Sequence, residues 1–203
     1  VIGGVAMYIG FLFASILLGL EPVFSSLLIG ASLLIVVGAI DDRFELPPAL
    51  RLIAQTCAVL VMIFMADLKL DNIGSPLFFD FGLGAFAVPF TILVTLTVIN
   101  AFNTIDGIDG LAGGVAFIVL GFMVIFSIGN DALALILLLM AVVAGFLICN
   151  FPLWSDRQAK CFMGDAGSTF LGFAMAWLGI SLTQGESASM SAVTGLWLVA
   201  VPI

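Results

Sequence analysis

The fold is decided by residues 132–149, which read ALALILLLMAVVAGFLIC. This stretch contains no charged side chain and no proline. A bilayer core about 30 Å thick is crossed by roughly 20 apolar residues in a helix, so a run of this length indicates a membrane span. In lipid, every backbone N–H and C=O group must be satisfied within the segment, which favours a helix.

Seven further apolar runs share this character, and short polar segments separate them. Together the predicted spans cover residues 3–20, 23–40, 49–66, 84–101, 111–129, 132–149, 166–184 and 191 onward. The runs are continuous rather than alternating, which excludes the pattern of a transmembrane barrel. We therefore predict an all-α, polytopic integral membrane helix bundle with about eight spans. We expect residues 1–203 to be a single transmembrane domain, truncated at both ends, because the chain begins without Met and ends inside a short apolar run.

The composition also indicates lipid as the solvent. The chain is 63% hydrophobic and only 9% charged, with a mean hydropathy of +1.34, whereas a soluble domain carries about 25% charged residues. The net charge of −8 argues against nucleic acid as a partner. Cys57, Cys149 and Cys161 have no zinc-site spacing, so we interpret them as free thiols.

The few basic residues predict the orientation. Arg43, Arg51, Arg157 and Lys160 fall on one side of the predicted spans, and Lys69 falls on the other. Since cytoplasmic loops are enriched in Lys and Arg, the first side is expected to face the cytoplasm. The acids of that side are Asp41, Asp42, Glu45, Asp106, Asp109, Asp156 and Asp165; those of the other side are Glu21, Asp67, Asp71, Asp80, Asp131 and Glu186.

The outer loop at 67–83 is predicted to form a small periplasmic hairpin. It contains the turn signal Gly74-Ser75-Pro76 between short apolar groups.

Adjacent carboxylates stand out at the end of the second predicted span. Asp41 and Asp42 repel one another unless a cation or solvent compensates their charge. An alternative is a solvated loop whose acids cap a helix, since Pro47-Pro48 marks a helix start.

A second polar segment follows the fourth predicted span. Asn103, Asp106 and Asp109 are spaced by three, so a helical turn would place them on one face. Gly107 and Gly110 permit the backbone to approach a ligand closely. Carboxylate and amide oxygens suit a hard cation such as Mg²⁺, often shared with substrate phosphates. The alternative is a polar turn between helices.

A third segment opens the seventh predicted span. Asp165 stands where an acid commonly caps a helix. Gly164, Gly167 and Ser168 could form a loop whose N–H groups cradle a phosphate, and Phe162 could stack on a base. The alternative is capping combined with close helix packing of small residues. Taken together, the three segments predict one polar pocket that binds a metal diphosphate at the membrane face.

These motifs resemble a known family. They are Asp41-Asp42, Asn103-x-x-Asp106-Gly-x-Asp109-Gly and Phe162-Met-Gly-Asp165-x-Gly-Ser. In this order they are similar to the polyprenyl-phosphate N-acetylhexosamine 1-phosphate transferases of the glycosyltransferase 4 type, and most similar to the bacterial undecaprenyl-phosphate members. The resemblance covers nearly the whole chain. It departs from the family at Asn150, where Pro152 follows at two positions rather than three, and in having no His. The family's His-rich motif is expected beyond residue 203.

The resemblance implies roles for particular residues. It implies that Asp165 is the Mg²⁺ ligand and that Asp41 and Asp42 lie near the lipid phosphate and the metal. The full set expected is catalytic Asp41, Asp42, Asp106 and Asp109, with Asn103, Phe162, Gly164 and Ser168 binding substrate. Within this set, we expect Asp41 to position the acceptor rather than act as a strong base.

The resemblance also implies a reaction. The enzyme would transfer GlcNAc 1-phosphate from UDP-GlcNAc to undecaprenyl phosphate and release UMP, using Mg²⁺, with Mn²⁺ as an alternative. This would be the first membrane step of a cell-envelope polysaccharide such as O-antigen, at the cytoplasmic face of the bacterial inner membrane. Other N-acetylhexosamines, the downstream polysaccharide and a homodimer stay open.

Three other classes of membrane protein fit the sequence less well. A transporter would carry acids at mid-span depth, whereas every Asp here lies at the end of a span. A CDP-alcohol phosphotransferase would need Asp-Gly-x-x-Ala-Arg, but Leu111-Ala112-Gly113 follows Asp109-Gly110. A non-catalytic scaffold would leave the clustered acids unexplained.

Overall fold

The structure is a computed structural model that describes residues 2–73, 82–151, 161–184 and 188–199. The described part is helical, which confirms the predicted all-α membrane fold. Its helices are α1 (Gly3–Leu17), α2 (Glu21–Phe44), α3 (Pro48–Ala66), the 3₁₀ turn η1 (Gly84–Phe86), α4 (Ala87–Ile105), α5 (Leu111–Phe126), α6 (Ala132–Asn150), α7 (Gly164–Thr183) and α8 (Ala192–Val199).

The helices differ in how well they match a bilayer. Within the described residues, five helical segments are long and apolar enough to cross a membrane: Phe24–Phe44, Pro48–Ala66, Gly84–Ile105, Ala132–Asn150 and Gly164–Thr183. The apolar helices α1 and α5 are shorter, at 15 and 16 residues, than the runs 3–20 and 111–129 that predicted them. This is a multi-pass membrane protein.

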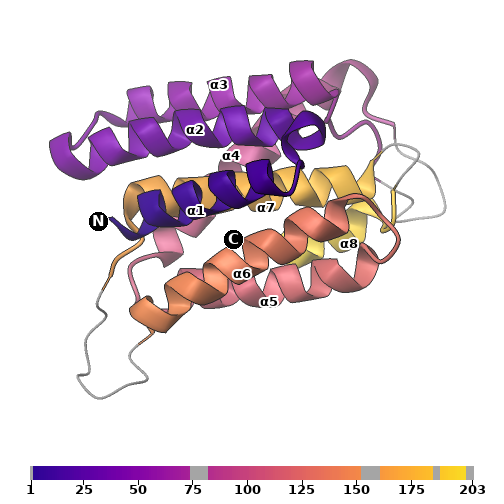
Figure 1. The fold of residues 1–203 in the computed structure, drawn as a ribbon. Coiled ribbons are helices and arrows are strands. Elements are labelled where there is room, and N and C mark those ends of the chain that lie inside the picture. The colour runs from indigo at the N-terminus through magenta and orange to yellow at the C-terminus, as the bar shows by residue number, and fades with distance from the viewer. Residues whose placement is uncertain (1, 74–81, 152–160, 185–187, 200–203) are drawn as a thin grey trace.

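Successive helices run in opposite directions. As a result, the first residues of α1, α3, α5 and α7 lie at the same end of the bundle as the last residues of α2, α4 and α6 (Figure 1, left). Arg43 and Arg51 lie at this end, and Lys69 lies at the other, as predicted for the described basic residues. Arg157, Lys160 and Asp156 lie outside the described residues.

Helix α7 lies at the centre of the bundle (Figure 1). It packs against α1, α2, α4, α5, α6 and α8. Every residue from Ala166 to Ile180 is buried. This enclosure explains why α7 has the lowest mean hydropathy of the five long segments, 1.3 against 2.0 to 3.0. A helix with no lipid-facing side needs small residues for close packing more than it needs a hydrophobic surface.

Two glycines allow neighbouring helices to reach the first turns of α7. A Cβ atom at Gly4 of α1 would lie 2.3 Å from the Gly167 backbone. One at Gly38 of α2 would lie 2.4 Å from the Ala166 Cα atom. Both contacts are with backbone, which cannot rotate away, so a larger residue would force the helices apart.

We expect Gly4→Ala to lower the free energy of unfolding by about 1–3 kcal/mol, the usual cost of overpacking. Gly10→Ala in the same helix is the matched control, because a Cβ atom there meets nothing within 4 Å. Unfolding in detergent, followed by circular dichroism, measures both variants. Equal stabilities for the two variants would contradict this packing.

Helix α2 is longer than predicted. The predicted span ends at residue 40, but α2 continues to Phe44, so Asp41 and Asp42 stand in its last turn rather than in a loop. The helix stops at Glu45, which adopts a left-handed conformation with φ of 50°. Pro47 is extended and Pro48 begins α3, as expected where proline opens a helix.

At the far end of the bundle, the predicted hairpin is represented by one antiparallel bridge between Asn72 and Gly82. The side-chain Oε1 of Gln184 accepts the N–H groups of Asp71 and Asn72 at 3.2 and 3.3 Å, which ties this loop to the end of α7. The turn at Gly74-Ser75-Pro76, and the acids Asp80 and Glu186, lie outside the described residues.

Candidate active site

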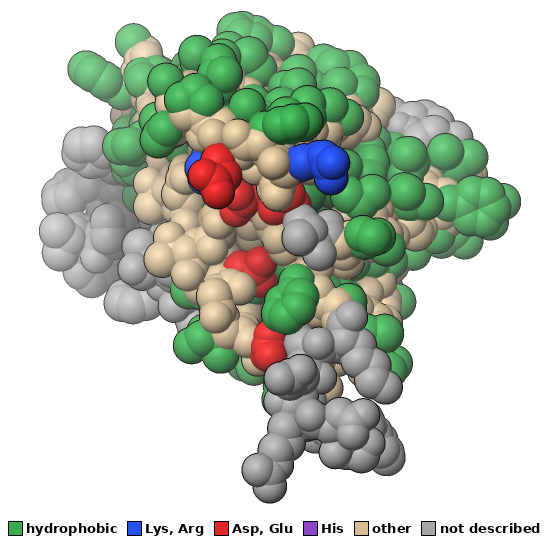
Figure 2. Space-filling model, turned by 90° about the vertical axis from the view of Figure 1, so that its left-hand side faces the viewer, with side chains coloured by type: hydrophobic (Ala, Val, Ile, Leu, Met, Phe, Trp, Pro, Cys, Tyr) green, Lys and Arg blue, Asp and Glu red, His purple; other side chains and the backbone are tan. Residues whose placement is uncertain are grey.

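Acidic side chains gather at the end of the bundle where α2, α4 and α7 meet. Figure 2 shows them in the middle of this face, with basic groups beside them. Asp41 is buried, and Asp42, Asp106 and Asp165 are half-buried. Segments far apart in the sequence therefore bring these four carboxylates together.

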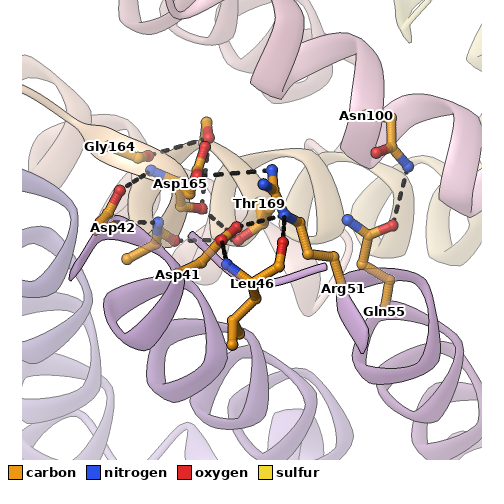
Figure 3. Close-up of polar contacts among 11 residues, drawn as sticks. Asp41, Asp42, Leu46, Arg51, Gln55, Asn100, Gly164, Asp165 and Thr169 are labelled. Carbon is orange, nitrogen blue, oxygen red and sulfur yellow. Dashed lines mark hydrogen bonds and ion pairs between the residues drawn. The ribbon is translucent and has the colours of Figure 1, made fainter. Parts of the chain in front are cut away.

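The first turn of α7 is capped by carboxylates from other helices. The Asp165 N–H donates to Asp42 Oδ1 at 2.8 Å, and the Ala166 N–H lies 3.5 Å from Asp42 Oδ2 (Figure 3). The Gly164 backbone also hydrogen-bonds to Asp106. The N-terminal N–H groups of a helix favour negative charge. The phosphate cradle expected at this turn is therefore already occupied by carboxylates in this structure.

The buried Asp41 is held by two partners. Its Oδ1 accepts the Leu46 N–H at 2.7 Å, and its Oδ2 pairs with Arg51 Nε at 2.8 Å (Figure 3). Arg51 Nε also donates to the Leu46 carbonyl at 3.2 Å. Both oxygens of Asp41 are engaged, which suits a positioning role.

Arg51 links Asp41 to Asp165. Its Nη1 lies 3.9 Å from Asp165 Oδ2, and the Asp41 and Asp165 side chains are within hydrogen-bonding distance of one another. Among the described residues, Arg51 is the cation that pairs with these carboxylates. From sequence, Arg51 is predicted only as a marker of membrane orientation. A signal was present, because an arginine near a helix N-terminus opposes the helix dipole and needs a nearby acid.

The second predicted motif is only partly on one face. Helix α4 ends at Ile105, so Asn103 is helical, Asp106 caps the helix and Asp109 is exposed in the following turn. The Asn103 side chain hydrogen-bonds to Asp165. Burial, followed by the charge of Asp165, raises the pKa of Asp106 to about 7. The bond from Gly164 opposes this rise, and Asp42 and Asp109 add to it, so the neighbouring carboxylates favour the protonated form of Asp106.

Asn150 joins two of the predicted segments. At the end of α6 it is buried; its Oδ1 accepts the Gly110 N–H at 2.7 Å, and its Nδ2 donates to the Cys161 carbonyl at 2.8 Å. Gly110 has a φ of 77°, which glycine adopts without strain. In this structure the amide of Asn150 therefore clamps the Asp106–Asp109 turn to the segment before α7. Pro152, which follows it, lies outside the described residues.

Phe162 and Ser168, the other two residues predicted to bind substrate, differ from one another in exposure. Phe162 is 56% exposed at this end, as a stacking surface requires. Ser168 is fully buried, and its hydroxyl donates to the Gly164 carbonyl at 3.0 Å inside α7. In this conformation the Ser168 hydroxyl bonds to the backbone of its own helix and is not exposed to a ligand.

Whether these residues suit a divalent cation depends on their donor atoms. Among the described residues, no three Asp, Glu, His or Cys side chains are already arranged as a metal site. Magnesium is usually bound by one or two carboxylates together with substrate phosphates and water, so a complete protein cage is not required. Arg51 pairs with Asp41 and Asp165, so the carboxylates of this end outnumber their described cationic partner, and their charge would favour a bound cation. Asp165, with the amide of Asn103 beside it, fits such an ion.

Comparisons with known proteins show what the chain is similar to. The family model described as "Glycosyl transferase family 4" matches residues 24–183. The undecaprenyl-phosphate alpha-N-acetylglucosaminyl 1-phosphate transferases of Yersinia pestis and Salmonella typhi are 35% and 37% identical over 207 and 215 residues. Each alignment covers 100% of this chain and 56% of the relative. A probable enzyme of this name from Bacillus subtilis is 33% identical over 207 residues. The chain thus spans little more than half the length of these relatives.

Proposed function

Because this chain belongs to glycosyl transferase family 4, we propose that it transfers N-acetylglucosamine 1-phosphate from UDP-GlcNAc to undecaprenyl phosphate and releases UMP. The observation that carries the proposal is the set of four carboxylates at one end of the bundle, two of which pair with Arg51. The names of the relatives state undecaprenyl phosphate and an N-acetylglucosaminyl 1-phosphate group, and their alignments extend over the whole chain, which includes the three motifs. We place this end of the bundle at the cytoplasmic face of the bacterial inner membrane, where the described arginines lie.

In this reaction an oxygen of the acceptor phosphate attacks the β-phosphorus of UDP-GlcNAc. The bond from that phosphorus to the bridging oxygen breaks, and UMP leaves with the electron pair. A phosphate monoester has a second pKa near 6, so the acceptor is already largely dianionic at neutral pH. A strong base is not required, in keeping with an Asp41 whose two oxygens are both engaged.

The carboxylates alone would repel two phosphorylated substrates. We propose that Asp165 and Asn103 hold a divalent cation, Mg²⁺ with Mn²⁺ as an alternative, which when bound would neutralise diphosphate charge. Asp42 and Asp106 fix the first turn of α7 and so keep Asp165 in place. Asp109 and Phe162 are both exposed, and in this proposal they would contact the substrate, with Phe162 stacking beside the uracil ring. Gly164 and Ser168 contribute by shaping this turn.

The proposal is tested with the protein in membranes, UDP-GlcNAc labelled in the sugar, and undecaprenyl phosphate. We expect labelled lipid and UMP in equal amounts, with both products lost when the acceptor or the divalent cation is withheld. UDP-GalNAc in place of UDP-GlcNAc tests the choice of sugar. Release of UDP instead of UMP would contradict the proposal, because it would mean that the sugar moves without its phosphate.

A further inference from the structure

Two cysteines lie together beside the candidate active site. Cys149 is in the last turn of α6, and Cys161 lies just before α7. Both side chains line the same groove between α1 and α6, and the two thiols interact with one another. Both are free cysteines, as the sequence predicted. The pair has no part in the proposed transfer reaction.

The backbone around the pair is held in place from two sides. The Asn150 amide, adjacent to Cys149, bonds to the carbonyl of Cys161 at 2.8 Å. The carbonyls of Phe162 and Met163 accept the N–H groups of Gly3 and Gly4, each at 3.1 Å. These bonds dock the Cys161 segment between α6 and α1, so the proximity of the thiols follows from the fold.

A groove gives reagents access to the pair. It runs between α1 and α6, has a volume of about 440 Å³, and is lined by both cysteines together with Gly3, Ala6, Gly145 and Phe146. Cys149 is exposed and Cys161 is half-buried. The lining is apolar, which suits an uncharged reagent that enters from the membrane phase.

We propose that Cys149 and Cys161 form a dithiol that a small apolar disulfide converts into an intramolecular disulfide. One thiolate attacks the reagent RSSR, forms a mixed disulfide and releases one RSH. The other thiolate attacks the protein sulfur of that mixed disulfide, which forms the Cys149–Cys161 bond and releases a second RSH. The protein loses two electrons and two protons, and the reagent gains them.

The bond would tie the end of α6 to the segment that leads into α7. Asn150 already makes this connection through one hydrogen bond, and the same residue holds the Gly110 turn. Burial raises the pKa of the Cys161 thiol, and Cys149 adds to this rise, so less thiolate is present at neutral pH. Closure therefore becomes faster as pH rises towards that pKa.

The test uses 4,4′-dithiodipyridine, an uncharged disulfide whose released thione is coloured. Cys57→Ser leaves only the pair and is the parent variant. Its derivatives with Cys149→Ser or Cys161→Ser are matched controls with one thiol each. With one equivalent of reagent, we expect the parent to release two thiones and to lose two hydrogens by mass, with no adduct retained.

Each control should release one thione and keep one pyridyl adduct. Dibromobimane, which fluoresces when both of its arms bind thiols, should give at least tenfold more signal in the parent than in either control. A pyridyl adduct retained on the parent, with no bridged species and no excess bimane signal, would overturn the proposal. Neither readout depends on transferase activity, so the result is independent of the proposed function.

Discussion

Asp165→Asn is expected to lower sugar-phosphate transfer by about 10³-fold, the loss seen when one preorganised electrostatic group is removed from a reacting centre. The side chain meets Arg51, Asp41 and Asn103, so it joins three parts of the site. Asn keeps the size and polarity of the residue and removes only its charge. The helix should therefore remain capped, because Asp42 bonds to the backbone of residue 165 rather than to its side chain.

The measurement is UMP release at saturating concentrations of both substrates. Asp131→Asn is the matched control, because Asp131 is an exposed acid at the opposite end of the bundle, where α6 begins. We expect the control to retain wild-type turnover. If Asp165→Asn kept more than a tenth of wild-type turnover, Asp165 would not be the central anionic group.

Arg51→Met is expected to destabilise the protein by about 2–3 kcal/mol, because it leaves a buried carboxylate without its cation. The side chain of Asp41 is 3% exposed, whereas that of Arg51 is 38% exposed. The cost therefore arises mainly at Asp41, which stays in the interior after the arginine is removed. Transfer activity should fall as well, since Asp41 and Asp165 then repel without a shared partner.

A double-mutant cycle separates the pair from its surroundings. Asp41→Asn keeps an oxygen for the Leu46 N–H but removes the buried charge. In that background, Arg51→Met should cost at least about 1 kcal/mol less than in the wild type, as expected for residues in contact. Arg43→Met is the control, since Arg43 is exposed in the last turn of α2. Additive effects in the cycle would show that the pair does not couple.

Helix positions could be predicted from sequence because lipid selects for long apolar runs. The residues 132–149 that decided the fold became α6, which the structure extends only to Asn150. The end of α2 was missed because Asp41 and Asp42 interrupt the apolar run without interrupting the helix. Hydropathy reports contact with lipid, and these acids lie where the helix leaves it.

The acidic site could be predicted only as a group of residues. Helices joined by short loops alternate in direction, so every second loop lies on the same side of the membrane. The acids stand in such loops or at the helix ends beside them, so their shared location follows from topology. Their pairing does not, because the Asp42 bond to Asp165 joins residues 123 positions apart. The Asn150 clamp and the Asp41–Arg51 pair are likewise tertiary contacts, which no local pattern specifies.

The central place of α7 has a consequence for how the chain is made. Its mean hydropathy of 1.3 is the lowest of the five long segments, so it gains the least from contact with lipid when it inserts. Five of its six neighbours, α1, α2, α4, α5 and α6, precede it in the chain and leave the ribosome first. We expect α7 to leave the translocon and pack between helices that are already in the membrane. Asp42 and Asp106 would then accept the N–H groups of its first turn.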